Sequence, residues 1–182
     1  MIPLGHLRPA VARGAWLAPS SVVAGAVTLG PDSSVWYGAV LRAEDATITI
    51  GAGSNIQDNA VVHVDAGAPA HIGEQVSVGH GAILHGCYIG SGTIVGMGSI
   101  VLSHARIGSD SMIAAGAVVA TDGQFPDRSL LVGVPARVRR TLTDDEVTEN
   151  LRQVQTYAQL AATHRQGISR IRSRSARAGN RR

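Results

Sequence analysis

Three histidines lie within 23 residues near the middle of the chain: His63 in the segment VVHVD, and His80 and His85 in VGHGAILHGC. Imidazole nitrogen is a common ligand of zinc and related transition metals. Three neutral imidazoles leave the fourth position of a tetrahedral ion open, which is typical of a catalytic metal rather than a structural one. These histidines are therefore the first candidates for chemistry, if the fold brings them together.

A repeat of branched aliphatic residues every six positions identifies the elements that must carry the histidines. A period of six fits neither an α-helix, at about 3.6, nor an amphipathic strand, at about 2. It fits a parallel β-solenoid in which each hexapeptide forms one short strand, three strands make a coil, and coils stack about 4.8 Å apart. The repeat breaks phase only three times, and its members are Leu17, Val23, Leu29, Val35, Leu41, Ile50, Ile56, Val62, Ile72, Val78, Leu84, Ile89, Val95, Val101, Ile107, Ile113 and Val119.

The phase of this repeat predicts where the histidines point. Val62 and Leu84 are inward positions one full coil apart, and His63 and His85 directly follow them. The two imidazoles should therefore be stacked neighbours directed outward, with backbones about 5 Å apart, close enough to share one ion. His80 belongs to the preceding face and can complete the site across a three-fold interface. The remaining histidines have no such relation and predict no site: His6, His71, His104 and His164.

These motifs closely resemble those of the γ-class carbonic anhydrases, a family of hexapeptide-repeat proteins. The family pattern is Q-D-x-x-x-x-H followed by G-H-x-x-x-x-H-G, and the segments 57–63 and 79–86 match it. The resemblance covers the chain to about Ala162. It implies a left-handed β-helix and a homotrimer. It also implies a zinc ion held by the first and third histidines of one subunit and the second histidine of its neighbour; cobalt and iron accept the same imidazoles.

The resemblance also implies roles for residues near the ion. Arg42 and Asp58 match an ion pair between subunits. Asn55 and Gln57 match two polar side chains beside the ion, of which Gln57 orients the zinc-bound hydroxide. Either Glu44 or Asp45 matches an acidic residue of the site, and Tyr157 matches a tyrosine that reaches over the pocket from a C-terminal helix.

The activity implied by the resemblance is the reversible hydration of CO₂ to bicarbonate, because zinc lowers the pKa of a bound water from about 15.7 to about 7. The most active members of the family carry an extended acidic loop after the first histidine. Here the segment Val64–Ala70 is short, with Asp65 its only acid, so we expect modest or absent turnover. Two alternatives stay open: a CoA-dependent acyltransferase without metal, and a non-catalytic accessory trimer whose metal locks the subunits together.

The repeat fades after Val119, and the chain then leaves the solenoid. Leu130–Arg140 resembles the closing G-x-P-A-[KR] stretch of the same superfamily, and Thr143–Glu146 predicts a capping box that opens a helix. Apolar residues at helical spacing predict the face of this helix that packs on the solenoid. They are Val147, Leu151, Val154, Ala158 and Ala161.

We therefore expect three parts: a β-helix domain at residues 1–140, a packed helix at 141–164, and a disordered Arg-rich tail at 165–182. The tail holds seven Arg and no acid, so the rest of the chain carries a net charge of −4 and lacks the basic face that nucleic-acid binding requires. The single cysteine, Cys87, excludes a disulfide within the chain and a Cys-based zinc site. Neither a long apolar run nor a signal-peptide core occurs, which favours a cytoplasmic protein without a membrane partner.

Overall fold

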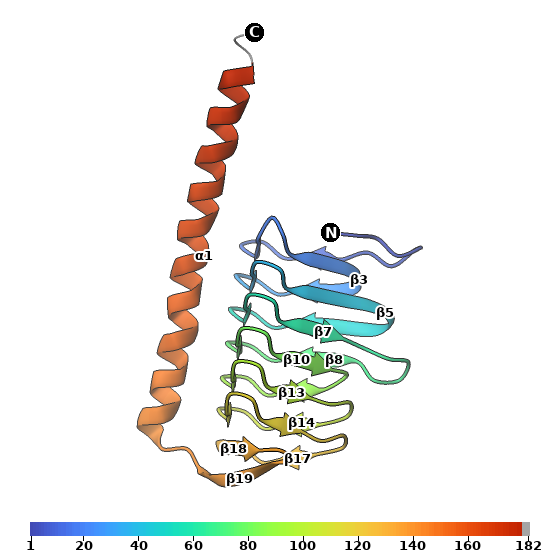
Figure 1. The fold of residues 1–182 in the computed structure, drawn as a ribbon, viewed down its shortest axis with the longest axis vertical. Coiled ribbons are helices and arrows are strands. Elements are labelled where there is room, and N and C mark those ends of the chain that lie inside the picture. Colours follow the sequence, from blue (N-terminus) through green and yellow to red (C-terminus); the bar gives the residue numbers. More distant parts are fainter. Residues whose placement is uncertain (180–182) are drawn as a thin grey trace.

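The structure, a computed structural model, describes the backbone of residues 1–179 and the side chains of residues 1–169. Short parallel strands wind into a triangular solenoid, and one long helix, α1 (Asp144–Gly179), lies along its side (Figure 1). The fold is the left-handed parallel β-helix of hexapeptide repeats that the sequence predicted. No helix of the described residues has both the length and the apolar character needed to cross a membrane.

One face of the solenoid lies under the helix, and we call it the α1 face. Seven parallel strands form it, and a final strand pairs antiparallel with the last of them to close the end of the solenoid. In order, they are β2 (Trp16–Leu17), β4 (Ser34–Val35), β6 (Asn55–Ile56), β9 (Ser77–Val78), β12 (Ile94–Val95), β15 (Met112–Ile113), β18 (Ser129–Gly133) and β19 (Ala136–Thr141).

The other two faces share one sheet, because β3 (Val22–Leu29) and β5 (Val40–Ile50) continue around the corner between them. The histidine face is built from the first halves of β3 and β5 with β7 (Val61–His63), β10 (Ile83–His85), β13 (Ile100–Val101) and β16 (Val118–Val119). The third face is built from their second halves with β1 (Ala10–Val11), β8 (Ala70–Ile72), β11 (Tyr88–Ile89), β14 (Arg106–Ile107) and β17 (Gln124–Phe125).

The aliphatic residues of the repeat form three inward columns, which are the core of the protein. On the histidine face, six of them pair in register from coil to coil and are fully buried: Val23, Leu41, Val62, Leu84, Val101 and Val119. Burying a branched aliphatic side chain contributes about 1.5–3 kcal/mol. The columns therefore stabilise the solenoid along its whole length, and only their end residues are exposed or partly exposed: Val11, Leu17 and Phe125.

The corner between the α1 face and the histidine face places one outward residue from each coil above the next. Backbone hydrogen bonds join Gly81 N–H to the Asp58 carbonyl and Gly98 N–H to the His80 carbonyl. Gly81 and Gly98 have φ angles of 67° and 64°, in the left-handed region that glycine adopts most easily, so the chain turns sharply after each stacked residue. The corner column defined in this way is Tyr37, Asp58, His80, Met97 and Ala115.

Aromatic side chains of the first coils attach α1 to the solenoid. The Trp36 ring contacts the rings of Trp16, Tyr157 and His164 edge-on, with centroid distances of 5.0, 5.2 and 5.1 Å. Tyr37 Oη and His164 Nδ1 share a hydrogen bond of 2.8 Å. His164, which the repeat left without a role, is therefore part of the contact between the helix and the solenoid.

The start of α1 is the capping box that the sequence predicted. Thr143 N–H donates to Glu146 Oε2 at 2.9 Å, and Glu146 N–H donates back to Thr143 Oγ1 at 3.3 Å. Arg140 forms two hydrogen bonds of 2.7 Å with the same carboxylate. Mainly because of the Arg140 hydrogen bonds, the pKa of Glu146 is lowered to about 2.

The helix continues beyond residue 164, where the apolar pattern predicted its end. Arg165 donates a hydrogen bond of 3.1 Å to the Ala15 carbonyl, and Ile168 packs against the aromatic cluster, so the packed face is longer than expected. Within the predicted face, Val154 and Ala161 are buried whereas Ala158 is exposed. The backbone of residues 165–179, where the sequence predicted a disordered tail, is helical. Residues 180–182 lie outside the described part of the chain, so disorder stays a prediction there.

Candidate functional site

His63 and His85 lie opposite one another in register on β7 and β10. Their rings are 5.1 Å apart between centroids, and His63 Nδ1 is 3.1 Å from His85 Nε2. Both side chains are mostly covered, with exposed fractions of 19% and 27%. The repeat therefore places two imidazole nitrogens against each other at the surface of the histidine face.

Neighbouring residues fix the orientation of this pair. His85 Nδ1 lies 2.9 Å from Ser103 Oγ, and a hydrogen donated to Ser103 leaves the Nε2 lone pair directed at His63. Glu44 Oε2 is 3.7 Å from His63 Nε2, and Glu44 forms an ion pair with Arg42. His63 Nε2 and Glu44 Oε2 are both buried and have no hydrogen-bond partner among the described residues. We call these residues (Arg42, Glu44, His63, His85) the pair half-site.

His80 lies away from the pair, at the corner column, with 44% of its side chain exposed. Its Nδ1 is 2.9 Å from Asp58 Oδ2, and its Nε2 is 3.1 Å from Tyr157 Oη on α1. Because a carboxylate only accepts, Nδ1 carries the hydrogen and Nε2 accepts from the tyrosine. Burial, with a smaller contribution from the Asp58 charge, raises the pKa of Tyr157, which favours the protonated donor at neutral pH.

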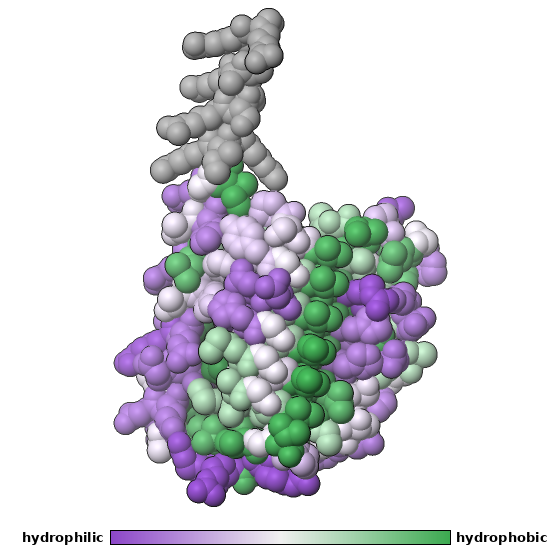
Figure 2. Space-filling view, viewed as in Figure 1, coloured by the Kyte–Doolittle hydropathy of each residue, from purple (hydrophilic) through white to green (hydrophobic). Residues whose placement is uncertain are grey.

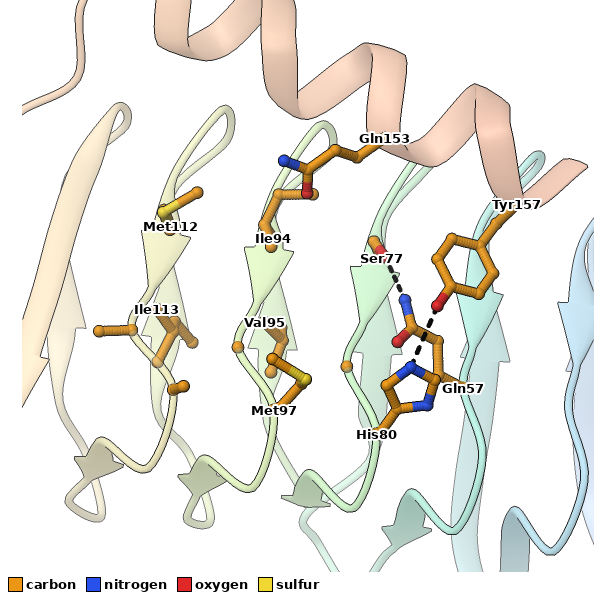
Figure 3. A pocket seen from close by; sticks show the side chains of 14 residues that line it. Gln57, Ser77, His80, Ile94, Val95, Met97, Met112, Ile113, Gln153 and Tyr157 are labelled. Atoms are coloured by element: carbon orange, nitrogen blue, oxygen red, sulfur yellow. Dashed lines mark hydrogen bonds between the residues drawn. The ribbon is translucent and has the colours of Figure 1, made fainter.

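A buried amide network lies next to His80 on the α1 face. Gln57 Nε2 donates to Asn55 Oδ1 at 3.1 Å and to Ser77 Oγ at 2.9 Å, and Ser77 Oγ donates to Asn55 Oδ1 at 2.9 Å. Figure 3 shows the amide nitrogen of Gln57 directed at Ser77. With both amide hydrogens used, Gln57 Oε1 is the group left free to contact a ligand. Asn55, Gln57, Asp58, His80 and Tyr157 together form what we call the groove half-site.

An apolar groove of about 300 Å³ extends from this half-site along the underside of α1 (Figure 3). Its polar end holds Gln57, Ser77, His80 and Tyr157. Its remaining walls are formed mainly by apolar side chains and small residues, among them Ile94, Met97, Met112, Ala114 and Ala115. The groove therefore leads from a mostly apolar chamber to an imidazole and a hydroxyl.

The predicted site residues thus fall into two groups on adjoining faces of one chain. In the pair half-site, Glu44 Oε2 is 3.7 Å from His63 Nε2, whereas the side chain of Asp45 is exposed. Of the two acids that the sequence left as alternatives, Glu44 is therefore the one that lies beside the histidine pair. Within one chain, Arg42 pairs with Glu44 and Asp58 with His80. The predicted ion pair of Arg42 with Asp58 is not formed inside the described chain, so it stays a prediction about two subunits.

The structure adds residues that the sequence reasoning did not assign to the site. Asp65 is one: in the described part of the chain, His63, Asp65 and His85 are the only three potential ligands whose donor atoms all lie within 4.8 Å of one another. Ser77 and Ser103 are two more. The phase of the repeat already pointed to them, because Ser77 pairs in register with Asn55 and Ser103 lies one unbroken coil after His85.

The histidine pair fits a transition-metal ion. Two nitrogens bound to a tetrahedral zinc ion at about 2.0–2.1 Å lie about 3.3 Å apart. The facing nitrogens, His63 Nδ1 and His85 Nε2, are 3.1 Å apart, which is close to that separation. Imidazole donors with carboxylates nearby suit zinc, cobalt and iron alike.

Comparisons with known proteins support the family and the fold. A family model described as bacterial transferase hexapeptide (six repeats) matches residues 86–121. The chain is 42% identical to "Probable carbonic anhydrase" of Methanocaldococcus jannaschii over 84% of this chain and 96% of that protein. It is 40% identical to "Gamma carbonic anhydrase 1, mitochondrial" of Arabidopsis thaliana over 86% of this chain, but spans only 59% of that longer relative.

A solved structure is similar over nearly the whole chain. A putative acetyltransferase of Bacillus cereus superposes with a TM-score of 0.88 at 32% identity, covering 90% of this chain and 95% of that one. The names of these similar proteins therefore point to two kinds of chemistry on one fold, hydration of CO₂ and transfer of acetyl groups.

Proposed function

Because this chain belongs to the γ carbonic anhydrase-like family of hexapeptide-repeat proteins, we propose that it is a zinc-dependent enzyme that interconverts CO₂ and bicarbonate at sites shared between the subunits of a homotrimer. The observation that carries the proposal is the pair of facing imidazole nitrogens, His63 Nδ1 and His85 Nε2, which are 3.1 Å apart.

The third protein ligand is proposed to be His80 of a neighbouring subunit. Within one chain, His80 is not part of the cluster around His63 and His85, and its Nδ1–H is already donated to Asp58. A carboxylate on the far nitrogen is the arrangement usually found behind a metal-bound histidine, because it fixes the ring. The ion would then bind Nε2 in place of the Tyr157 hydroxyl, which occupies that nitrogen within one chain. Asp65 is the competing third ligand, since it comes from the same chain as the pair.

The residues around the ion have distinct proposed tasks. A zinc ion bound at this site would lower the pKa of water at its open position to about 7, which supplies a nucleophile at neutral pH. His63, His85 and the neighbour's His80 would hold the ion. Gln57 presents Oε1 in a fixed orientation, since Asn55 and Ser77 hold its Nε2.

Turnover is proposed to be limited by the export of protons. The loop after His63 supplies one carboxylate, Asp65, whose Oδ2 is 3.7 Å from His85 Nε2 and whose side chain is 64% exposed. Glu44 is the other nearby acid, but Arg42 neutralises it. With so few groups to carry a proton into solvent, we expect a modest rate even when the site is fully loaded.

A second function is favoured by the groove itself. Pockets that bind drug-sized ligands begin at about 300 Å³, whereas one water occupies about 30 Å³ and CO₂ is not much larger. A groove of about 300 Å³ next to His80 therefore has room for an acyl group, as a CoA-dependent acyltransferase requires. Burial raises the pKa of the Cys87 thiol to about 12, so His80 rather than this cysteine would be the base. An accessory trimer without catalysis remains the third alternative.

Elemental analysis and stopped-flow CO₂ hydration on one unchelated sample test the proposed function. We expect one zinc per chain and acceleration that a chelator abolishes. Cobalt or iron in place of zinc would correct the metal alone, whereas a loaded trimer without acceleration at any pH would reject the activity. Acetyl-CoA binding in a calorimeter that a chelator does not alter would favour the acyltransferase.

Mixing two inactive variants tests whether the third ligand comes from a neighbour. His80→Ala keeps the pair and His85→Ala keeps His80, so a cyclic trimer of both chains contains one complete site. With random mixing, about three quarters of the trimers contain both variants, and each of these has one complete site out of three. About a quarter of wild-type activity should therefore return. If Asp65 is the ligand instead, His80→Ala alone stays metal-bound, Asp65→Asn loses the metal, and mixing restores nothing.

A further inference from the structure

The outward positions of the third face differ in chemistry from those of the histidine face. On the histidine face, the position before each buried aliphatic is Val or Ile from β3 onward, and a continuous hydrophobic stripe runs over β5, β7 and β10 in Figure 2. On the third face, the same position is polar, charged or aromatic from β3 onward. In chain order, these register partners are Thr28, Thr49, His71, Tyr88, Arg106 and Gln124.

Three of these side chains form a stack across successive coils. The rings of His71 and Tyr88 are nearly parallel, with an interplanar angle of 11° and a centroid distance of 5.0 Å. In the next coil, the guanidinium carbon of Arg106 lies over the Tyr88 ring, 4.2 Å from its centroid. The Tyr88 ring is therefore held between two neighbours, and it fixes the position of the Arg106 guanidinium.

Arg106 has no acidic partner, although its position is fixed. Its side chain is exposed, and it takes part in none of the ion pairs formed among the described residues. A cation–π contact uses no N–H donor, so the guanidinium keeps its donors for the oxygens of a carboxylate or phosphate group. A side chain that is already held in place loses less conformational freedom when it binds a ligand. Arg106 is therefore prearranged to bind an oxyanion.

A hollow of about 300 Å³ opens beside Arg106, where the histidine face bends into the third face. We call it the anion hollow. Small residues contribute to its lining, among them Gly86 and Ala105. His104, to which the sequence assigned no role, also lines it and adds an imidazole. None of its described lining residues is an acid, so its charge favours an anion.

A second hollow, of about 360 Å³, lies against the same two side chains, Tyr88 and Arg106. Its lining includes Asp127, whose carboxylate accepts a hydrogen bond of 2.7 Å from Ser109 N–H. A negative charge at this place would repel an anion. Of the two hollows beside Arg106, the anion hollow is therefore the one that suits an anionic ligand.

We propose that the anion hollow binds a small organic anion, whose carboxylate or phosphate group contacts Arg106 and accepts a hydrogen bond from His104. A volume of about 300 Å³ is at the lower end of small-molecule pockets, so the hollow suits an anion that carries a ring or a short chain. The site contains none of the proposed metal ligands. It goes beyond the proposed function and does not depend on it.

Three probes that share one ring test the class of ligand. Phenyl phosphate, benzoate and phenol are titrated separately into zinc-loaded, full-length protein in a calorimeter. We expect an anionic probe to bind and neutral phenol not to bind. Binding of phenyl phosphate alone assigns a phosphate ester, binding of benzoate alone assigns a carboxylate, and binding of both assigns either oxyanion. If neither anion binds, or if phenol binds as tightly as they do, the inference is overturned.

Variants at Arg106 test the contact itself. Arg106→Ala should weaken binding of the anion by about tenfold or more, because a charged hydrogen-bond donor is lost. Arg106→Lys keeps the charge without the planar fork of donors, so its affinity should lie between those of Arg106→Ala and wild type. Arg139→Ala removes another exposed arginine, on β19, and is the matched control that should bind like wild type. Equal affinities in Arg106→Ala and wild type would reject the contact.

Two measurements separate the anion hollow from the metal site, since zinc itself attracts anions. His85→Ala, which breaks the proposed metal site, should bind the anion with wild-type affinity. In wild type, the bound anion should slow the modification of Arg106 by phenylglyoxal, followed by peptide mass spectrometry, while Arg139 reacts at an unchanged rate. Binding that requires zinc, or that leaves Arg106 unprotected, would overturn the inference. Protein that binds the anion at Arg106 but never accelerates CO₂ hydration would reject the proposed function alone.

Discussion

The pair half-site and the groove half-site differ in how many of their polar atoms have hydrogen-bond partners within one chain. In the groove half-site, His80 has partners on both ring nitrogens, and Gln57 has partners for both amide hydrogens. The pair half-site keeps two buried atoms, His63 Nε2 and Glu44 Oε2, without described partners. The α1 face is covered by its own helix, whereas the histidine face exposes the apolar side chain of Ile83 beside the histidine pair.

This difference bears on which side of the solenoid would contact a metal ion or a neighbour in the proposed trimer. A hydrogen-bond network whose polar atoms are all paired within the chain stabilises the folded monomer. A network with unpaired buried atoms is stabilised only when a ligand or a second copy of the chain binds. The groove half-site is not fully closed, since Asn55 Nδ2 also lacks a described partner. Even so, the contrast predicts that substitutions on the histidine face affect metal binding, and that substitutions under α1 affect stability.

The largest effect is expected from removing one member of the histidine pair. His85→Ala leaves a single imidazole on the histidine face, so metal content should fall to background and CO₂ hydration to the rate without enzyme. The free energy of unfolding of the chelated protein should change by less than about 1 kcal/mol, because the residue is partly exposed. His71→Ala, a histidine of the third face that stacks on Tyr88, is the matched control and should keep metal and activity. Equal losses in both variants would contradict the assignment.

The opposite behaviour is expected under α1. Trp36 is 4% exposed and contacts Trp16, Tyr157 and His164, so Trp36→Ala should lower the free energy of unfolding by about 3–5 kcal/mol. Urea unfolding at one fixed protein concentration measures this, because association of the proposed trimer would add to the measured stability. Metal content below the transition should stay that of wild type. A variant that lost its metal while fully folded would show that α1 also organises the ion site.

An intermediate effect is expected where the two regions meet, at the buried amide network. Ser77→Ala removes one of the two acceptors of Gln57 Nε2, so the amide loses its fixed orientation. Groups that orient the surroundings of a metal typically contribute about 10–100-fold to affinity or activity. We expect kcat/KM to fall within that range, with metal content retained. Ser111→Ala, a buried serine in the turn before β15 and two coils away from Ser77, should leave kcat/KM unchanged.

The repeat made the fold and much of the site predictable, because each inward position of a stacked coil must be apolar. Once Val62 and Leu84 are known to be one coil apart, the register of His63 with His85 follows. The contact of Tyr157 with His80 was suggested only by family resemblance, because it depends on where α1 lies relative to the coils. The length of α1 was underestimated, since an Arg-rich composition concealed the apolar contact of Ile168.

The smallest effect concerns the capping box, where the attachment of α1 can be tested without touching either half-site. Glu146 has an ordinary pKa of 4.5 in the unfolded chain and about 2 in the folded one, so its contribution to stability is complete above about pH 4.5. The contribution declines as the pH falls through about 2, because protonation then breaks the bonds to Arg140 and Thr143. Wild type should therefore be slightly more stable than Glu146→Gln at pH 7, and the gap should shrink in acid. It should also shrink in high salt, since the carboxylate is exposed. A gap independent of pH would mean that the backbone of the cap, rather than its charge, fixes the start of α1.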